Sequence, residues 1–150
     1  MPPTLRSVDD SSFAEMVEPL LTAARDARRY AHAPYSKFQV GAALLVRGHI
    51  FTGVNIETVD YLVTHAEGSA ISAMRAAGYG EMQMIVAVGA MHASPPDQAP
   101  VVTPCGKCRQ DIYEWVMGTR HDIDVIVPDP VSKELRLCSI RELLPLSFGG

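Results

Sequence analysis

The chain has 150 residues, of which 47% are hydrophobic, and a formal net charge of −4 at pH 7. This length allows one domain with a sizeable core and is short for two, so we expect a single domain over residues 1–150. The acidic balance and the scattered arginines leave no basic face to follow a phosphate backbone, which disfavours a nucleic-acid partner.

Targeting segments and cysteine usage point to one compartment. No apolar run approaches the roughly 20 residues that cross a bilayer, and residues 1–10 lack the apolar core of a signal peptide. Three cysteines, two of them three residues apart, suit a metal or catalytic set in a reducing compartment better than a disulfide framework. We therefore expect a cytoplasmic protein that does not bind a membrane.

The first predicted element is a helix. Apolar residues recur at helical spacing over residues 13–32, and Ser11 or Ser12 can serve as the N-cap. Pro19 lies inside this stretch and removes a backbone hydrogen bond, so we expect the helix to break near it.

The rest of the chain alternates between strands and helices. We expect a hairpin of strands at 38–46 and 49–55 that turns at Arg47-Gly48, followed by a helix at 66–77 and a buried strand at 82–90. A loop at 91–104 then leads to a helix at 105–117 and a buried strand at 123–127. The last predicted elements are an edge strand at 135–138 and a helical turn at 140–144. This order predicts an α/β sandwich with a mixed β-sheet.

The most informative motif joins Thr64-His65-Ala66-Glu67 to Pro104-Cys105-Gly106-Lys107-Cys108 and matches the signature of zinc deaminases. Two cysteines at i and i+3 lie on one side of a first helical turn, where the helix N-terminus favours thiolates. His65 and Glu67 converge only if His65 stands at the helix entrance, outside helical geometry.

The chemistry of zinc explains this residue set. Three protein ligands, His65, Cys105 and Cys108, are the number expected for catalytic Zn²⁺, because a fourth position stays open for water. Zinc lowers the pKa of that water, and Glu67 can take its proton and pass it to a ring nitrogen and a leaving amine. Glu67 is thus predicted to be catalytic without being a ligand.

A structural zinc site is the alternative reading of the same cysteines. It requires a fourth ligand, for which Cys138, His92 and His121 are the soft candidates. The chain would then be a zinc-stabilised binding module without turnover. Cys138, beside the apolar Leu137, is more simply a small buried residue.

Over nearly all its length the chain resembles the small cytidine deaminases. The motifs that carry the resemblance are Ala-Pro-Tyr-Ser-Lys-Phe at 33–38, Val-Gly-Ala-Ala at 40–43, Gly-Val-Asn-Ile-Glu at 53–57, Cys-Gly-Lys-Cys-Arg-Gln at 105–110 and Glu-Leu-Leu-Pro at 142–145. The resemblance implies a three-layer αβα sandwich and a homotetramer. It also implies hydrolysis of cytidine or 2′-deoxycytidine to the uridine product and ammonia, in pyrimidine salvage.

The resemblance further implies contacts with the nucleoside substrate. These fall on Phe38, Asn55, Glu57, Ala66, Tyr61 and Phe148. The resemblance implies that Phe38 lies against the base and that Asn55 and Glu57 bind the sugar hydroxyls. This is physically consistent, since an amide and a carboxylate two apart on a strand share a face. Phe148 resembles a tail aromatic that reaches the active site of a neighbouring subunit.

Two features depart from the family pattern. Small relatives usually have cysteine where this chain has His65 and arginine where it has Gly68. Three thiolates around Zn²⁺ leave one net negative charge that an arginine can offset, whereas two thiolates and a neutral histidine leave none. We therefore interpret the two differences as linked.

The second departure lies in residues 58–64, which are one residue shorter than in typical relatives, between Tyr61 and His65. Because this loop is expected to border the substrate, the alternative function is the same chemistry on a modified cytosine nucleoside or a blasticidin-like antibiotic. Glu57 disfavours the antibiotic.

Overall fold

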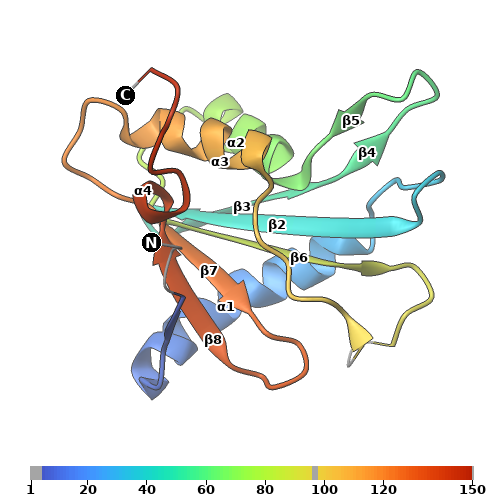
Figure 1. Ribbon diagram of the computed structural model, residues 1–150, viewed down its shortest axis with the longest axis horizontal. Coiled ribbons are helices and arrows are strands. Elements are labelled where there is room, and N and C mark those ends of the chain that lie inside the picture. The colour runs from blue at the N-terminus through green and yellow to red at the C-terminus, as the bar shows by residue number, and fades with distance from the viewer. Residues whose placement is uncertain (1–4, 96–97, 150) are drawn as a thin grey trace.

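A six-stranded mixed sheet forms the middle layer of the computed structural model, which describes residues 5–95 and 98–149 (Figure 1). Its spatial order is β1-β8-β7-β6-β2-β3, and within it β6 and β7 are parallel whereas the other pairs are antiparallel. The strands are β1 (Arg6–Ser7), β2 (Phe38–Val46), β3 (His49–Val54), β6 (Met84–Met91), β7 (Asp124–Pro128) and β8 (Leu135–Ser139). A separate hairpin of β4 (Ile56–Glu57) and β5 (Val63–Thr64) projects beyond the sheet (Figure 1).

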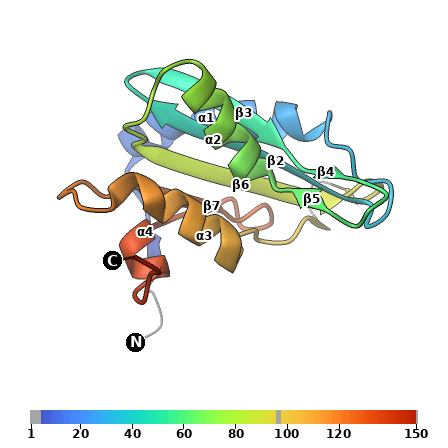
Figure 2. The same ribbon diagram turned by 90° about the horizontal axis from the view of Figure 1, so that it is seen from above.

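Helices cover both faces of this sheet, which gives three layers (Figure 2). Helix α1 (Ser11–Arg28) lies on one face, and α2 (Ala66–Ala76) and α3 (Gly106–Tyr113) lie on the other. A 3-10 turn at Glu114–Val116 continues α3, and α4 (Ile140–Leu143) follows β8. The predicted αβα sandwich is confirmed. Within the described ranges, none of the helices combines the length and apolarity needed to cross a bilayer.

Neighbouring residues of the central strands fill two separate cores. Ala43 and Val86 pack with α1, whereas Ala42 and Ile85 belong to the cluster that includes α2 and α3. Side chains of a strand alternate between the two faces of a sheet, and both faces here are covered. The continuous apolar runs of the sequence therefore belong to strands buried on both sides.

Helix α1 differs from the predicted helix at its start and near its middle. Asp10, not a serine, is the N-cap, and its carboxylate accepts a hydrogen bond from the Ser12 amide at 2.9 Å. The helix continues through Pro19, so the predicted break is wrong. Leu20 and Leu21, directly after the proline, are almost fully buried. Their packing against the sheet outweighs the one hydrogen bond that proline removes.

The strand predictions hold for the hairpin and fail at the sheet edge. Arg47 and Gly48 have φ angles of 48° and 79° and form the expected tight turn between β2 and β3. Strand β8 is not an edge strand, because β1 pairs with it and aligns Arg6 with Leu137. The two residues of β1 are too few to produce a recognisable alternating pattern.

Candidate metal centre and substrate pocket

Two helix N-termini meet above the sheet and bring three metal-binding side chains together. His65 is the N-cap of α2 with extended backbone angles of −79° and 149°, so it stands outside helical geometry as its convergence with Glu67 requires. Cys105 is the N-cap of α3, and Cys108 lies in the first turn of that helix. The Nδ1 atom of His65 lies 3.4 Å from the Sγ atom of each cysteine.

This donor set fits Zn²⁺. The three donor atoms all lie within 4.8 Å of one another. Zinc holds thiolate sulfur at about 2.3 Å and imidazole nitrogen at about 2.0 Å, so the ligand atoms of one ion lie within roughly 4 Å of each other. One imidazole and two cysteines leave a fourth position for water, as a catalytic site requires.

The Cys108 thiol is buried close to a carboxylate. Burial raises the pKa of the Cys108 thiol above its ordinary value, and the nearby Glu67 carboxylate raises it further. A divalent cation works in the opposite direction because it stabilises the thiolate.

The candidates for a fourth structural ligand lie elsewhere among the described residues. Cys138 is buried in β8, where burial raises the pKa of its thiol to about 11. The ring of His92 is hydrogen-bonded to the Gln39 side chain, and Nε2 of His121 lies 2.7 Å from the Met82 carbonyl oxygen. The structural-site alternative therefore lacks its fourth ligand in this part of the chain.

A pocket of about 220 Å³ opens beside the metal donors. It is lined by Phe38, Val40, Asn55, Val63, His65, Ala66, Glu67, Val102, Thr103 and Cys105. Glu67, in the first turn of α2, is only 5% exposed. The predicted catalytic carboxylate, two of the predicted ligands and three predicted substrate contacts thus share one cavity.

The aromatic wall of the pocket depends on a glycine. A Cβ atom added to Gly89 of β6 would lie 2.8 Å from the Phe38 ring and 3.2 Å from a methyl group of Val102. Side chains do not tolerate a contact of 2.8 Å in a packed interior. Gly89 therefore provides the space in which the Phe38 ring lies against β6.

Asn55 has a structural contact as well as a place in the pocket. It follows the end of β3, and its side-chain amide donates to the Phe38 carbonyl at 2.9 Å while its side-chain oxygen accepts from the Val40 amide at 2.8 Å. These two bonds fix the start of β2. An asparagine amide carries a second N–H and its oxygen a second lone pair, so Asn55 retains the capacity to bind a ligand.

Glu57 lies in β4, outside the residues that line the pocket, and is 7% exposed. Its carboxylate accepts hydrogen bonds from the Ser36 hydroxyl and from the Ser36 amide at 3.0 Å. These bonds lower the pKa of Glu57 below its ordinary value. The Glu57 carboxylate is thus held by Ser36, and its predicted contact with the sugar stays a prediction.

Tyr61 and Phe148 do not reach the pocket within a single chain. Tyr61 lies in the turn between β4 and β5 and is 90% exposed, and Phe148 is 87% exposed. Gln110 of α3 holds the tail by accepting from the Phe148 amide at 3.0 Å and donating to its carbonyl at 3.1 Å. The Phe148 ring is therefore presented outward from a fixed backbone.

Sequence reasoning missed the polar residues that support the site. Ser36 and Gln110 lie within the quoted family motifs, but neither was singled out, because their partners are distant in sequence. Thr103 was assigned only to a loop, although it lines the pocket two residues before Cys105. Its closeness in sequence to the predicted metal ligand Cys105 is the one local signal that could have identified it.

Comparisons with known proteins agree with this geometry. The family model of the cytidine and deoxycytidylate deaminase zinc-binding region matches residues 14–120. A cytidine deaminase of Sporosarcina psychrophila is 39% identical over 134 residues, which cover 88% of this chain and 90% of the relative. Crystal structures of cytidine deaminases from Burkholderia pseudomallei and Mycobacterium tuberculosis are 36% and 35% identical, with TM-scores of 0.72 and 0.69. They align with 87% and 89% of this chain and with 98% and 97% of their own.

Proposed function

Because the chain belongs to the cytidine and deoxycytidylate deaminase family, we propose that it hydrolyses cytidine and 2′-deoxycytidine to uridine or 2′-deoxyuridine and ammonia. The single observation that carries the proposal is the buried Glu67 in the same pocket as His65 and Cys105. A proton carrier beside three zinc donors is the arrangement that hydrolytic deamination needs.

The proposed mechanism assigns each step to a side chain of this pocket. Zinc, held by His65, Cys105 and Cys108, would supply an activated water molecule as the nucleophile. Glu67 takes a proton from that water and delivers it to the ring nitrogen of cytosine, and it then carries a second proton to the leaving amine. One water is consumed and one ammonia is released. The low exposure of Glu67 keeps competing bulk water away from this transfer.

The remaining pocket residues are proposed to select a nucleoside. Phe38 stacks against the base, Ala66 borders it, and the free N–H of Asn55 with the ionised Glu57 binds the sugar hydroxyls. A site built from buried polar groups discriminates against ligands that leave those groups unpaired. Free cytosine is therefore expected to be a poor substrate.

We further propose a homotetramer in the cytoplasm that serves pyrimidine salvage as a single domain. Phe148 would then contact substrate in a neighbouring subunit, and Tyr61 is proposed to contact it from the loop at residues 58–64. Both side chains are exposed and so are available for contacts with another chain. The three cysteines are free thiols, which suits a reducing compartment.

Ammonia release from a panel of compounds tests the proposal. We expect turnover of cytidine and 2′-deoxycytidine and little of free cytosine. Activity confined to monophosphates would overturn the substrate assignment, and activity confined to a base-acylated cytidine or blasticidin S would favour the alternative based on residues 58–64.

Glu67→Ala distinguishes an enzyme from a binding module. We expect the variant to keep stoichiometric zinc and to lose about 10²–10⁴-fold in kcat, the usual contribution of a general acid–base. A wild-type protein that binds zinc but releases no ammonia from any compound would indicate a non-catalytic module instead.

A further inference from the structure

The turn between β4 and β5 holds a bulky residue in an unfavourable backbone conformation. Tyr61 has a φ angle of 63°. The left-handed region suits glycine and asparagine, whereas bulky side chains are rarely found there. Because Tyr61 is 90% exposed, packing within the chain does not compensate for this conformation. Backbone strain of this kind gathers at functional sites and persists only where the surrounding structure enforces it.

The hairpin geometry explains why this position is left-handed. The Tyr61 amide donates to the Thr58 carbonyl at 3.0 Å, and the Thr58 amide donates to the Leu62 carbonyl at 3.1 Å. These two bonds define a three-residue hairpin loop, in which a type I turn is followed by a left-handed residue that is ordinarily glycine. Tyrosine therefore occupies a position for which local turn chemistry favours glycine.

The Asp60 carboxylate enforces this turn. Its Oδ1 atom accepts hydrogen bonds from the Thr58 hydroxyl and from the Leu62 amide, the latter at 3.3 Å. Asp60 thus joins the residues that flank β4 and β5. The Thr58 hydroxyl, followed by the Leu62 amide, lowers the pKa of Asp60 below its ordinary value, so the carboxylate stays ionised in mild acid.

The hairpin that this turn closes carries residues of the substrate site. Glu57 of β4 pairs with Val63 of β5, and Val63 lines the pocket that contains Glu67. The predicted metal ligand His65 directly follows β5. Each strand has only two residues, and a slip of one residue would turn their side chains to the opposite face. The turn therefore has to determine the register of Glu57 and Val63.

We propose that Asp60 is a positioning residue of the substrate site, which holds Tyr61 in its left-handed conformation and so fixes the register of β4 and β5. This inference rests on the proposed deamination of nucleosides, in which Glu57 binds the sugar. Asp60 acts through the hairpin and not by contact with the reacting atoms. Its effect is therefore expected on nucleoside binding rather than on the proton transfers of Glu67.

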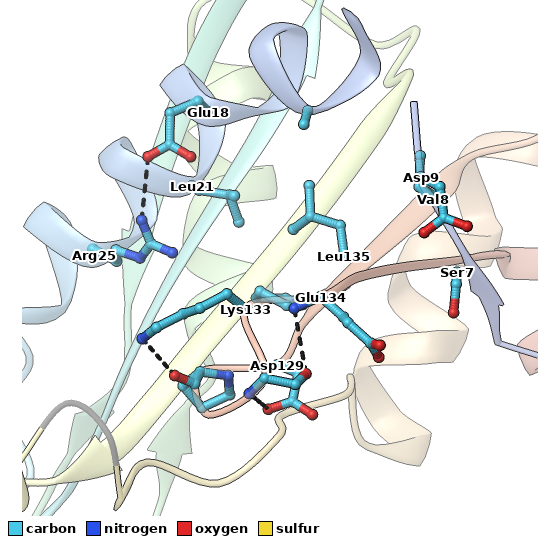
Figure 3. Close-up of a pocket in the computed structure, with 14 residues that line it drawn as sticks. Ser7, Val8, Asp9, Glu18, Leu21, Arg25, Asp129, Lys133, Glu134 and Leu135 are labelled. Carbon is cyan, nitrogen blue, oxygen red and sulfur yellow. Dashed lines mark hydrogen bonds and ion pairs between the residues drawn. The ribbon is translucent and has the colours of Figure 1, made fainter. Parts of the chain in front are cut away.

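The loop between β7 and β8 provides a matched comparison (Figure 3). Lys133 in this loop has a φ angle of 65°. The Asp129 carboxylate accepts hydrogen bonds from the amides of Val131 at 2.9 Å and Ser132 at 3.1 Å. An aspartate thus again caps a turn that contains a left-handed residue other than glycine. Among the described residues, the pocket of about 720 Å³ beside this loop shares no lining residue with the pocket that contains Glu67.

Steady-state kinetics of the zinc-loaded protein with cytidine test the proposal. We expect Asp60→Ala to raise KM about three- to tenfold, the net value of one hydrogen bond, and to change kcat less. Asp60→Asn keeps a side-chain oxygen that accepts hydrogen bonds and should remain close to the wild type. Asp129→Ala removes the corresponding carboxylate from the comparison loop and should leave KM unchanged. An unchanged KM in Asp60→Ala, or an equal rise in Asp129→Ala, would overturn the role of Asp60.

Amide hydrogen exchange tests the same role without reference to activity. The Thr58 amide should be protected in the wild type and should exchange several-fold faster in Asp60→Ala. Adding Tyr61→Gly to Asp60→Ala should restore the protection, because glycine adopts the left-handed conformation without strain. Failure to restore it would overturn the link between Asp60 and Tyr61. If exchange follows the expected pattern but the wild type releases no ammonia from cytidine, the proposed function fails and the hold of Asp60 on the hairpin stands.

Discussion

The ionisation of Glu57 depends on a hydroxyl group that comes from a distant part of the chain. The Ser36 hydroxyl is the main cause that lowers the pKa of Glu57. A carboxyl group whose folded pKa is lowered contributes stability above its ordinary pKa and loses that contribution as the pH falls through the lowered value. Glu57 therefore stays charged further into the acidic range than a free glutamate.

Ser36→Ala should raise the pKa of Glu57 and so weaken sugar binding at mildly acidic pH. We expect KM for cytidine to increase several-fold and kcat to change less, because Glu57 does not contact the reacting atoms. The pH dependence of kcat/KM should show its acidic limb shifted to higher pH. Ser36→Thr retains the hydroxyl and should behave like the wild type; an unchanged acidic limb in Ser36→Ala would contradict this role.

The charge balance of the metal ligands gives a second prediction. A Cβ atom added to Gly68 would meet only the Asp111 carboxylate, at 3.9 Å, so an arginine side chain has space to start there. We expect His65→Cys alone to lower zinc affinity roughly tenfold, in the range usual for changes around metal ligands, and Gly68→Arg to restore part of it. Zinc competition with a chelator measures both variants. Full affinity of His65→Cys, with no gain from the added arginine, would show that the two positions are independent.

At the scale of secondary-structure elements, the metal centre depends on how closely α2 lies on β3. A Cβ atom added to Gly53 would come within 2.2 Å of the Ala70 amide nitrogen and 2.3 Å of the Ala66 carbonyl oxygen. Both are backbone atoms of the helix that begins at the metal donor His65. Any side chain at Gly53 must therefore displace α2.

Gly53→Ala should lower the free energy of unfolding by about 1–3 kcal/mol, the usual cost of overpacking a core. Zinc affinity should fall as well, because the displaced helix carries His65. Urea unfolding and zinc competition measure the two effects. The control is Gly68→Ala, which lies in helix α2 itself. A Cβ atom has space there, so this variant should be neutral or stabilising. Equal changes in unfolding free energy and zinc affinity in the two variants would show that close packing does not require a glycine at position 53.

Local patterns predicted the elements that carry strong periodicity, and tertiary contacts decided the rest. The hairpin at Arg47-Gly48 and the helix after His65 follow from turn chemistry and spacing within a few residues. The continuity of α1 through Pro19 depends on packing against the sheet, which local rules do not include. The two bonds from Asn55 to the backbone of β2 require the register of two strands.

At the scale of the whole molecule, several large apolar side chains are exposed to solvent on the single chain. The hairpin of β4 and β5 extends away from the sheet and exposes Val59, Tyr61 and Leu62 at its end (Figure 1). The tail exposes Leu146 and Phe148. A short hairpin of this kind is only marginally stable in water. Contacts with other copies of the chain would both bury these residues and order the hairpin.

For the proposed homotetramer, sedimentation of the zinc-loaded protein is expected to show four copies of the chain. Leu62→Glu places a charge on a hairpin residue that is 68% exposed. We expect it to dissociate the assembly and to lower activity on cytidine, since Phe148 would no longer complete a neighbouring site. Val131→Glu is the matched control, because Val131 is 66% exposed but lies in the loop between β7 and β8. It should remain tetrameric and active. A wild-type monomer with full activity would show that one chain suffices for the site, and equal dissociation of both variants would remove the special role of the hairpin.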